Sequence, residues 1–204
     1  MIKMIKNPYA QAQFIKSAAR VHQLPPDSGF EVAFAGRSNA GKSSAINTLT
    51  GIRQLARTSK TPGRTQLINL FEIDPSRRIV DLPGYGFAKV GLQIKRDWQE
   101  NLAQYLEVRQ CLCGLIVLMD IRHPLKDLDQ MIIDWALRRQ LSVHLLLTKA
   151  DKLSRSEAKA TMLQVKKFYQ NDAELISVQT FSSLKKEGID ELIIKLNHWF
   201  GWQS

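Results

Sequence analysis

The stretch Gly36-Arg37-Ser38-Asn39-Ala40-Gly41-Lys42-Ser43 decides the fold of this 204-residue chain, because it has the complete Gly-x-x-x-x-Gly-Lys-Ser pattern of a phosphate-binding loop. The apolar, β-prone run 30–35 before it predicts a strand, and residues 44–49 after it read as the opening of a helix. Successive backbone N–H groups and the helix N-terminus provide the positive potential that phosphate oxygens need. A glycine-rich turn before a helix is the alternative, and the motifs further along the chain weigh against it.

Each motif around this loop has a predicted task. Lys42 is expected to reach the β- and γ-phosphates of a nucleotide, and Ser43 to give its hydroxyl to Mg²⁺. Asp81, in an Asp-x-x-Gly segment after a short strand, is expected to hold Mg²⁺ through a water molecule, with the Gly84 N–H on the γ-phosphate. Read alone, that segment is an ordinary Pro-Gly turn. The predicted phosphate contacts are Gly36, Arg37, Ser38, Asn39, Ala40, Gly41, Lys42, Ser43, Ser44 and Gly84.

The segment Thr148-Lys149-Ala150-Asp151 follows a strongly apolar run and resembles the guanine-specificity element of GTPases, which is usually Asn-Lys-x-Asp. The Asp151 carboxylate is suited to accept two hydrogen bonds, from guanine N1–H and the exocyclic amino group, whereas adenine offers no such donor pair. Lys149 is expected to lay its stem over the base. The triplet 182–184 fits a loop whose backbone N–H groups meet guanine O6. The predicted guanine-binding residues are Thr148, Lys149, Asp151, Ser182, Ser183 and Leu184.

Strands and helices alternate along the chain, which predicts a mostly parallel six-stranded sheet with one antiparallel edge pair and helices on both faces. Residues 1–28 are predicted to be an N-terminal extension before a GTP-binding domain at 29–204, and residues 8–22 fit either a short helix or an added strand. The expected strands are 30–35, 67–73, 77–81, 113–120, 142–148 and 174–180, and the expected helices are 42–50, 93–108, 125–140, 154–170 and 188–201.

Residues 51–66 form a connection that is long for a compact domain, and such loops are usually functional or disordered. In a GTPase this segment occupies the place of switch I. Thr65 is the candidate ligand of Mg²⁺ in the presence of a γ-phosphate, and Thr61 is the second choice. The glycine-rich segment 84–91 is predicted to rearrange with the nucleotide as a second switch. The predicted switch I residues are Thr61, Pro62, Gly63, Arg64 and Thr65.

Composition limits the class of protein. A hydrophobic content of 44% is enough for one buried core, and no apolar run reaches the length of a membrane span. The lysines near the N-terminus are not followed by a continuous apolar core, so a secretory signal is not expected and the predicted location is the cytoplasm. Cys111 and Cys113 are too few and too close together for a disulfide framework or a zinc site.

The formal net charge of +10 is unevenly distributed. The segment between Glu31 and Glu72 contains no acidic residue. A solvated basic surface is one interpretation, and a polyanion that touches the switch loop is the favoured one. The loop has no interleaved aromatic residues, which indicates contact with phosphates rather than reading of bases. The basic residues of this segment are Arg37, Lys42, Arg53, Arg57, Lys60 and Arg64.

These motifs together are similar to those of one family. Segments 36–44, 61–66, 81–86 and 148–151, with Asp120-Ile121-Arg122-His123-Pro124, resemble the bacterial EngB (YihA/YsxC) GTPases of the TrmE-Era-EngA-YihA-Septin branch. The resemblance implies a Ras-like P-loop GTPase fold, GTP as ligand, Mg²⁺ as cofactor and a role in maturing the large ribosomal subunit. It also implies an association with septum formation in cell division. Ribosomal RNA is then the expected polyanion, and DNA is not an expected partner.

Hydrolysis of GTP is predicted to be slow. Tyr85 stands where Ras-type enzymes carry a water-orienting Gln, and a phenol with a pKa of about 10 is a poor base. Asn39 resembles the phosphate-loop Asn that binds K⁺ in related GTPases, which makes K⁺ a candidate second cation. Two other functions stay open. One is a GTPase serving RNA modification or cell division, and the other is a P-loop ATPase or nucleotide kinase, which the guanine element argues against.

Overall fold

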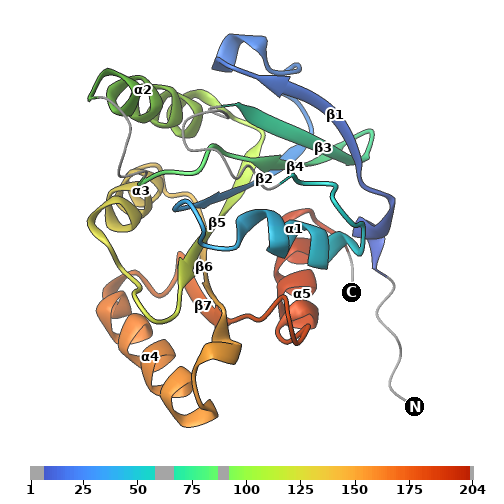
Figure 1. Ribbon diagram of the computed structural model, residues 1–204. Helices are drawn as coiled ribbons and strands as arrows, with labels where there is room; N and C mark the ends of the chain where they lie inside the picture. The colour runs from blue at the N-terminus through green and yellow to red at the C-terminus, as the bar shows by residue number, and fades with distance from the viewer. Residues whose placement is uncertain (1–6, 58–66, 87–91, 203–204) are drawn as a thin grey trace.

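The computed structural model describes residues 7–57, 67–86 and 92–202 and shows a seven-stranded sheet between two layers of helices (Figure 1). The strand order is β1-β3-β4-β2-β5-β6-β7. The predicted α/β architecture, mostly parallel with helices on both faces, is confirmed. The strands are β1 Gln13–Ala18, β2 Phe30–Gly36, β3 Ile68–Asp74, β4 Arg77–Asp81, β5 Leu112–Asp120, β6 Val143–Thr148 and β7 Ile176–Thr180. The long helices are α1 Lys42–Thr50, α2 Leu92–Val108, α3 Asp127–Arg138, α4 Arg155–Phe168 and α5 Ile189–Trp199.

The sheet has one strand more than the six that were predicted. β1 pairs antiparallel with β3, which pairs antiparallel with β4, so the antiparallel edge is wider than the predicted hairpin. The open choice for residues 8–22 thus resolves as an added strand. Five of the six residues of β1 are exposed, so no alternation of polar and apolar residues marks it in the sequence. The Phe14 ring lies 6.0 Å from the ring of Phe71, its cross-strand partner on β3, and this contact helps to hold β1 at the edge of the sheet. The division between extension and domain at residue 28 stays a prediction.

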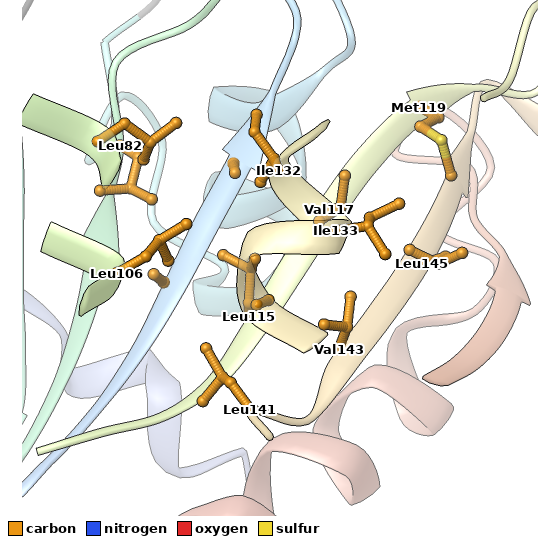
Figure 2. Close-up of a cluster of buried hydrophobic side chains, with 14 of the residues drawn as sticks. Leu82, Leu106, Leu115, Val117, Met119, Ile132, Ile133, Leu141, Val143 and Leu145 are labelled. Carbon is orange, nitrogen blue, oxygen red and sulfur yellow. The ribbon is translucent and has the colours of Figure 1, made fainter. Parts of the chain in front are cut away.

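β5 shows why the central strands read as continuous apolar runs. Its side chains alternate between two cores, with Leu115, Val117 and Met119 on one face of the sheet and Ile116 and Leu118 on the other. Helices α2, α3 and α4 cover the first face, and α1 and α5 cover the second (Figure 1). Figure 2 shows the first core, where side chains of β5 and β6 pack against those of α3. Within the described ranges, no helix is both long and apolar enough to cross a membrane.

A buried ion cluster fixes the start of β2. The Glu31 side chain is fully buried and accepts hydrogen bonds from Arg78 Nε at 3.0 Å and from Arg109 Nη2 at 2.7 Å. Tyr105 donates its hydroxyl to the same carboxylate at 3.2 Å. A charge removed from water is tolerated when it is paired and hydrogen-bonded. The cluster therefore ties β2 to β4 and to the end of α2, at the far end of the strand from the phosphate loop.

Glu31→Gln should lower the free energy of unfolding by about 3–5 kcal/mol, because two buried guanidinium groups would lose the carboxylate that compensates them. Urea unfolding followed by tryptophan fluorescence measures the change. Glu174→Gln, which neutralises an exposed carboxylate, is the control, with an expected change within about 0.5 kcal/mol. Equal changes in the two variants would contradict the role of the cluster.

Candidate nucleotide-binding site

The predicted site residues meet where the parallel strands end. β2 pairs in parallel with β4 and β5, and β6 and β7 continue the parallel sheet, so the carboxyl ends of these strands lie at one edge. The phosphate loop follows β2, Asp81 ends β4 and Thr148 ends β6. Open α/β sheets bind ligands at this edge. The structure therefore brings together motifs that are more than a hundred residues apart in the chain.

The backbone of the predicted phosphate loop contains two residues with positive φ before α1. Gly41 precedes α1 with φ 92° in the left-handed region, and it makes no side-chain cap hydrogen bond. Glycine has no side chain to cap the first N–H groups of α1, so the cap position is open to a phosphate. Asn39 also has a positive φ of 65°, which Asn tolerates better than most residues. The Ala40 N–H donates to the Arg37 carbonyl at 2.9 Å and closes the turn.

Lys42 and Asp81 form an ion pair, and both side chains are largely buried. Ser43, the next residue, donates its hydroxyl to the Arg57 carbonyl at 3.4 Å. Two of the predicted Mg²⁺ ligands, Ser43 and Asp81, are thus close to the lysine predicted to bind phosphate. The third, Thr65, lies outside the described residues, as does all of the predicted switch I, 61–65. Among the residues that are described, no three His, Cys, Asp or Glu side chains cluster as they would around a metal ion.

Backbone hydrogen bonds tie the segment after Asp81 to the phosphate loop. The Ser38 N–H donates to the Tyr85 carbonyl at 2.7 Å, and the Tyr85 N–H donates to the Gly36 carbonyl at 3.3 Å. These bonds keep Gly84 beside Ser38, where its N–H was predicted to meet the γ-phosphate. Residues 87–91 of the predicted second switch lie outside the described residues.

The Tyr85 side chain is buried in the core between α2 and α3. Its hydroxyl donates to Asp129 Oδ1 at 2.6 Å, and its ring lies 5.3 Å from that of Trp98. Trp98 in turn donates its indole N–H to the Pro83 carbonyl at 3.3 Å. Burial raises the pKa of the Tyr85 hydroxyl well above its ordinary value, and Asp129 adds to this effect. A neutral phenol engaged with Asp129 is not available to orient a water molecule at the phosphates.

Thr148 connects the guanine element to the phosphate loop. Its hydroxyl donates to the Ala40 carbonyl at 2.6 Å and lies 3.1 Å from the Met119 carbonyl. The Thr148 hydroxyl thus provides a hydrogen-bond donor to the loop carbonyl of Ala40. A threonine can therefore occupy the first position of the guanine element, where most GTPases have asparagine. The structure gives Thr148 a contact with the loop, and its contact with the base stays a prediction.

Asp151 is held as an ionised acceptor. Ser182 donates its hydroxyl to Asp151 Oδ1 at 2.6 Å, and the Lys152 ammonium lies 3.5 Å from Oδ2. The hydrogen bond from Ser182 is the main cause that lowers the pKa of Asp151 below its ordinary value. An ionised carboxylate can only accept hydrogen bonds, which is the property that the predicted contact with guanine requires.

In the loop after β7, one of the N–H groups predicted to meet guanine already has a partner within the protein. The Ser182 N–H donates to the Glu187 carbonyl at 3.1 Å, so it is not available for guanine O6. The side chain of Ser182 fixes Asp151 instead, and the amides of Ser183 and Leu184 remain as the predicted partners of O6. The Leu184 side chain is 76% exposed, which leaves an apolar surface next to the predicted base site.

Sequence reasoning missed two contacts in this region. Lys149 Nζ lies 3.0 Å from Asp120 Oδ2, at the end of β5. Asn47 of α1 accepts from the Ala56 N–H at 2.8 Å and donates to the Ala56 carbonyl at 3.0 Å, and so anchors the segment after α1. An aspartate at a strand end is a signal that could have pointed to the first contact, whereas an Asn within a helix gives none.

Comparison with known proteins identifies the family. A family model described as a 50S ribosome-binding GTPase matches residues 31–149. A "Probable GTP-binding protein EngB" from Hamiltonella defensa is 59% identical over 199 residues, which cover 98% of this chain and 97% of the relative. The chain belongs to the EngB family. Another EngB protein, from Enterobacter sp. (strain 638), is 58% identical over 192 residues, 94% of this chain and 92% of the relative.

Solved structures agree with the fold of this EngB-family chain. The crystal structure of a probable GTP-binding protein EngB matches with a TM-score of 0.69 at 18% identity, over 84% of this chain and 98% of that one. Era in complex with MgGDPNP and nucleotides 1506–1542 of 16S ribosomal RNA matches with a TM-score of 0.64 at 22% identity, over 84% and 57%. At these identities the likeness shows the Ras-like fold alone. Family membership makes the chain a GTP-binding protein that hydrolyses GTP, which sets the ATPase alternative aside.

Tyr85→Phe should leave the rate of GTP hydrolysis nearly unchanged, because the phenol is engaged with Asp129. It should lower the free energy of unfolding by about 1–3 kcal/mol, because Asp129 loses its donor. Phosphate release and urea unfolding measure the two effects. Tyr9→Phe is the matched control, since it removes another buried hydroxyl, 2.8 Å from Asn197. A fall in rate of about tenfold at unchanged nucleotide affinity would instead give the Tyr85 phenol a part in hydrolysis.

Proposed function

We propose that this protein is a GTP-controlled switch in the assembly of the large ribosomal subunit. The observation that carries the proposal is the contact of a basic segment with the nucleotide site. The Arg57 carbonyl accepts from Ser43, and the Arg53 and Arg57 side chains are exposed. The description of the family model as ribosome-binding supports an RNA partner, and Era shows that a protein of the same fold can bind ribosomal RNA. A link to cell division rests on the family resemblance alone.

The residues around the phosphate loop fit a Mg²⁺–nucleotide complex. The Ser43 hydroxyl and the Asp81 carboxylate are the hard oxygen ligands that Mg²⁺ prefers, and Thr65 is the proposed third. When bound, Mg²⁺ neutralises charge on the phosphate oxygens. In this proposal Lys42 exchanges Asp81 for phosphate oxygens, and the Asp81 carboxylate is then released from its ion pair to face the metal. The N-terminal amides of α1 after Gly41 supply the remaining positive potential.

Guanine recognition is proposed for Asp151, whose ionised carboxylate complements the two donors on the guanine edge. Ser182 fixes one carboxylate oxygen, so the side chain is oriented before the base arrives. The Lys149 stem and the exposed Leu184 offer apolar surface to the base, and burying that surface favours binding. The amides of Ser183 and Leu184 are the proposed donors to guanine O6.

We expect slow hydrolysis because the Tyr85 phenol is bound to Asp129 and cannot orient a water molecule at the phosphates. Asn39, which is exposed in the phosphate loop, is the proposed ligand of a K⁺ ion that supplies positive charge in the transition state. The proposal requires faster hydrolysis in K⁺ than in Na⁺ and loss of that difference in Asn39→Ala. Equal rates of the wild-type protein in the two salts would remove K⁺ from the account.

The metal site and the basic segment share an atom. The hydroxyl oxygen of Ser43 is proposed to bind Mg²⁺, and the same hydroxyl contacts the Arg57 carbonyl. Asn47 fixes Ala56, the residue before Arg57, by two further hydrogen bonds. Binding of Mg²⁺ by the Ser43 hydroxyl would therefore alter its hydrogen bond to Arg57. In this way the bound nucleotide can control how the exposed Arg53 and Arg57 are presented to a polyanion.

Asp151→Asn should shift the preference of the protein from guanine toward xanthine nucleotides, because an amide can donate where the carboxylate could only accept. Affinity for GDP should fall about a hundredfold or more, since two donors of guanine lose their acceptors. Competition of GDP, XDP and ADP against a fluorescent GDP analogue measures both effects. Asp190→Asn, which neutralises an exposed aspartate on α5, is the control. Wild-type protein that binds ATP as tightly as GTP would refute the assignment of residues 148–151.

Replacing both Arg53 and Arg57 by Ala should weaken binding to large-subunit assembly intermediates. The slope of log affinity against log salt should shrink in magnitude by about 1.4–1.8, at 0.7–0.9 per lost phosphate contact. GTP affinity should change little, because neither residue belongs to the phosphate loop. Replacing Lys166 and Lys167 on α4, which are also exposed, is the control of equal charge. Co-sedimentation across a salt series, with GDP and with a non-hydrolysable GTP analogue, is the measurement.

Binding is expected to be tighter with the GTP analogue than with GDP. The proposal would be wrong if the two double variants lost affinity equally, or if binding depended on neither salt nor nucleotide. The excess of basic residues would then be explained as a solvated surface. Lys60 and Arg64, the other basic residues of the predicted switch loop, lie outside the described residues, so the design uses Arg53 and Arg57.

A further inference from the structure

The segment Asp120-Ile121-Arg122-His123-Pro124 has no part in the nucleotide contacts described above. Asp120 is the last residue of β5 and pairs in register with Thr148, the first residue of the guanine element. The Ile121 N–H donates to the Thr148 carbonyl at 3.0 Å. The segment therefore lies directly beside the residues proposed to bind guanine.

The Asp120 carboxylate is held on both oxygens. Oδ1 accepts from Arg122 Nε at 2.9 Å and from the Arg122 N–H at 3.1 Å. Oδ2 accepts from Arg122 Nη2 at 2.7 Å and from Lys149 Nζ at 3.0 Å. Arg122 and then Lys149 hold the pKa of Asp120 well below its usual range. A two-point contact between guanidinium and carboxylate fixes orientation as well as charge, so Arg122 orients Asp120, and Asp120 in turn orients Lys149.

Stability of the fold does not explain this arrangement. The side chains of Arg122, Lys149 and Asp120 are 43%, 33% and 19% exposed. Partly exposed ion pairs stabilise a protein little, because water and salt compete for the charges. The larger effect falls on Lys149, whose long side chain has many rotamers when its ammonium is free. The contact with Asp120 selects among them.

We propose that Asp120 and Arg122 form a brace that positions the stem of Lys149 for the guanine base. The inference rests on the proposed function of residues 148–151. The Lys149 backbone lies in the left-handed region with φ 58°, which sets the direction in which its side chain leaves the chain. The contact of the Lys149 ammonium with Asp120 also restricts the rotamers of the Lys149 side chain before the base binds. Binding then loses less side-chain entropy, so its entropy cost falls. Asp120 is a positioning residue that acts through Lys149.

Asp120→Asn tests the brace, because it keeps the size of the side chain and removes the charge that holds Lys149. Affinity for GDP, measured by competition with a fluorescent GDP analogue, should fall about two- to tenfold, as expected when one long side chain must be ordered on binding. In a Lys149→Ala background the same substitution should have no further effect. This double-mutant cycle separates the brace from a merely structural role, which would lower affinity equally in both backgrounds.

Asp74→Asn is the matched control. Asp74 forms a comparable, partly exposed ion pair with Arg77 at 3.0 Å, in the β3–β4 turn far along the chain from the guanine element. Thermal unfolding should show similar small changes for Asp74→Asn and Asp120→Asn, and only Asp120→Asn should change the affinity for GDP.

Asp151→Asn in the same assay distinguishes failure of the brace from failure of the guanine assignment. If Asp151→Asn shifts preference toward xanthine nucleotides and Asp120→Asn leaves GDP affinity unchanged, the assignment stands and the brace is overturned. Equal losses from Asp120→Asn with and without Lys149 also overturn the brace. If Asp151→Asn leaves the preference unchanged, the assignment of residues 148–151 fails and the brace fails with it.

Discussion

The parallel pairing of β2 with both β4 and β5 is the constraint on which the nucleotide site depends. A phosphate loop works only if the amides at the start of α1 stay directed at one point, and Gly41 makes no side-chain cap bond that would hold them. β2 provides the rigidity, because both of its neighbours pair with it along its length. The buried Glu31 fixes the start of β2, at the end of the strand opposite to the loop. Because these contacts are shielded from water, the strand holds the loop in a constant position.

The other motifs attach to this loop by a few contacts each. Thr148 connects the guanine element through the Ala40 carbonyl, and the Ser38 N–H connects the Asp-x-x-Gly segment. Ser43 connects the basic segment that follows α1. A ligand on the loop is therefore one bond from each of the three. The ion pair of Lys42 with Asp81 is the contact that a nucleotide must alter, because both residues have other proposed partners in the bound state.

The placement of the predicted phosphate loop and guanine element at the ends of strands could be predicted, because each motif lies within a few consecutive residues. The burial of Tyr85 could not, because its partner Asp129 belongs to α3 and the contact depends on how that helix packs. The bond from Ser182 to Asp151 likewise depends on the register of β6 and β7. β1 was one of two alternatives for residues 8–22, and the sequence could not decide between them because its mostly exposed residues carry no periodic signal. Motifs of a few consecutive residues can be recognised in the sequence. Contacts between residues of distant elements can be identified only from the structure.

A crystal structure with Mg²⁺ and a non-hydrolysable GTP analogue tests most directly whether the phosphate loop is already formed and only its ion pair exchanges. The account predicts that Lys42 Nζ binds a phosphate oxygen and separates from Asp81. The hydrogen bonds of Thr148 to Ala40 and of Ser182 to Asp151 should persist, with the loop backbone unchanged. A bound nucleotide with Lys42 still on Asp81, or a loop rebuilt so that the bond from Thr148 to Ala40 is lost, would contradict it.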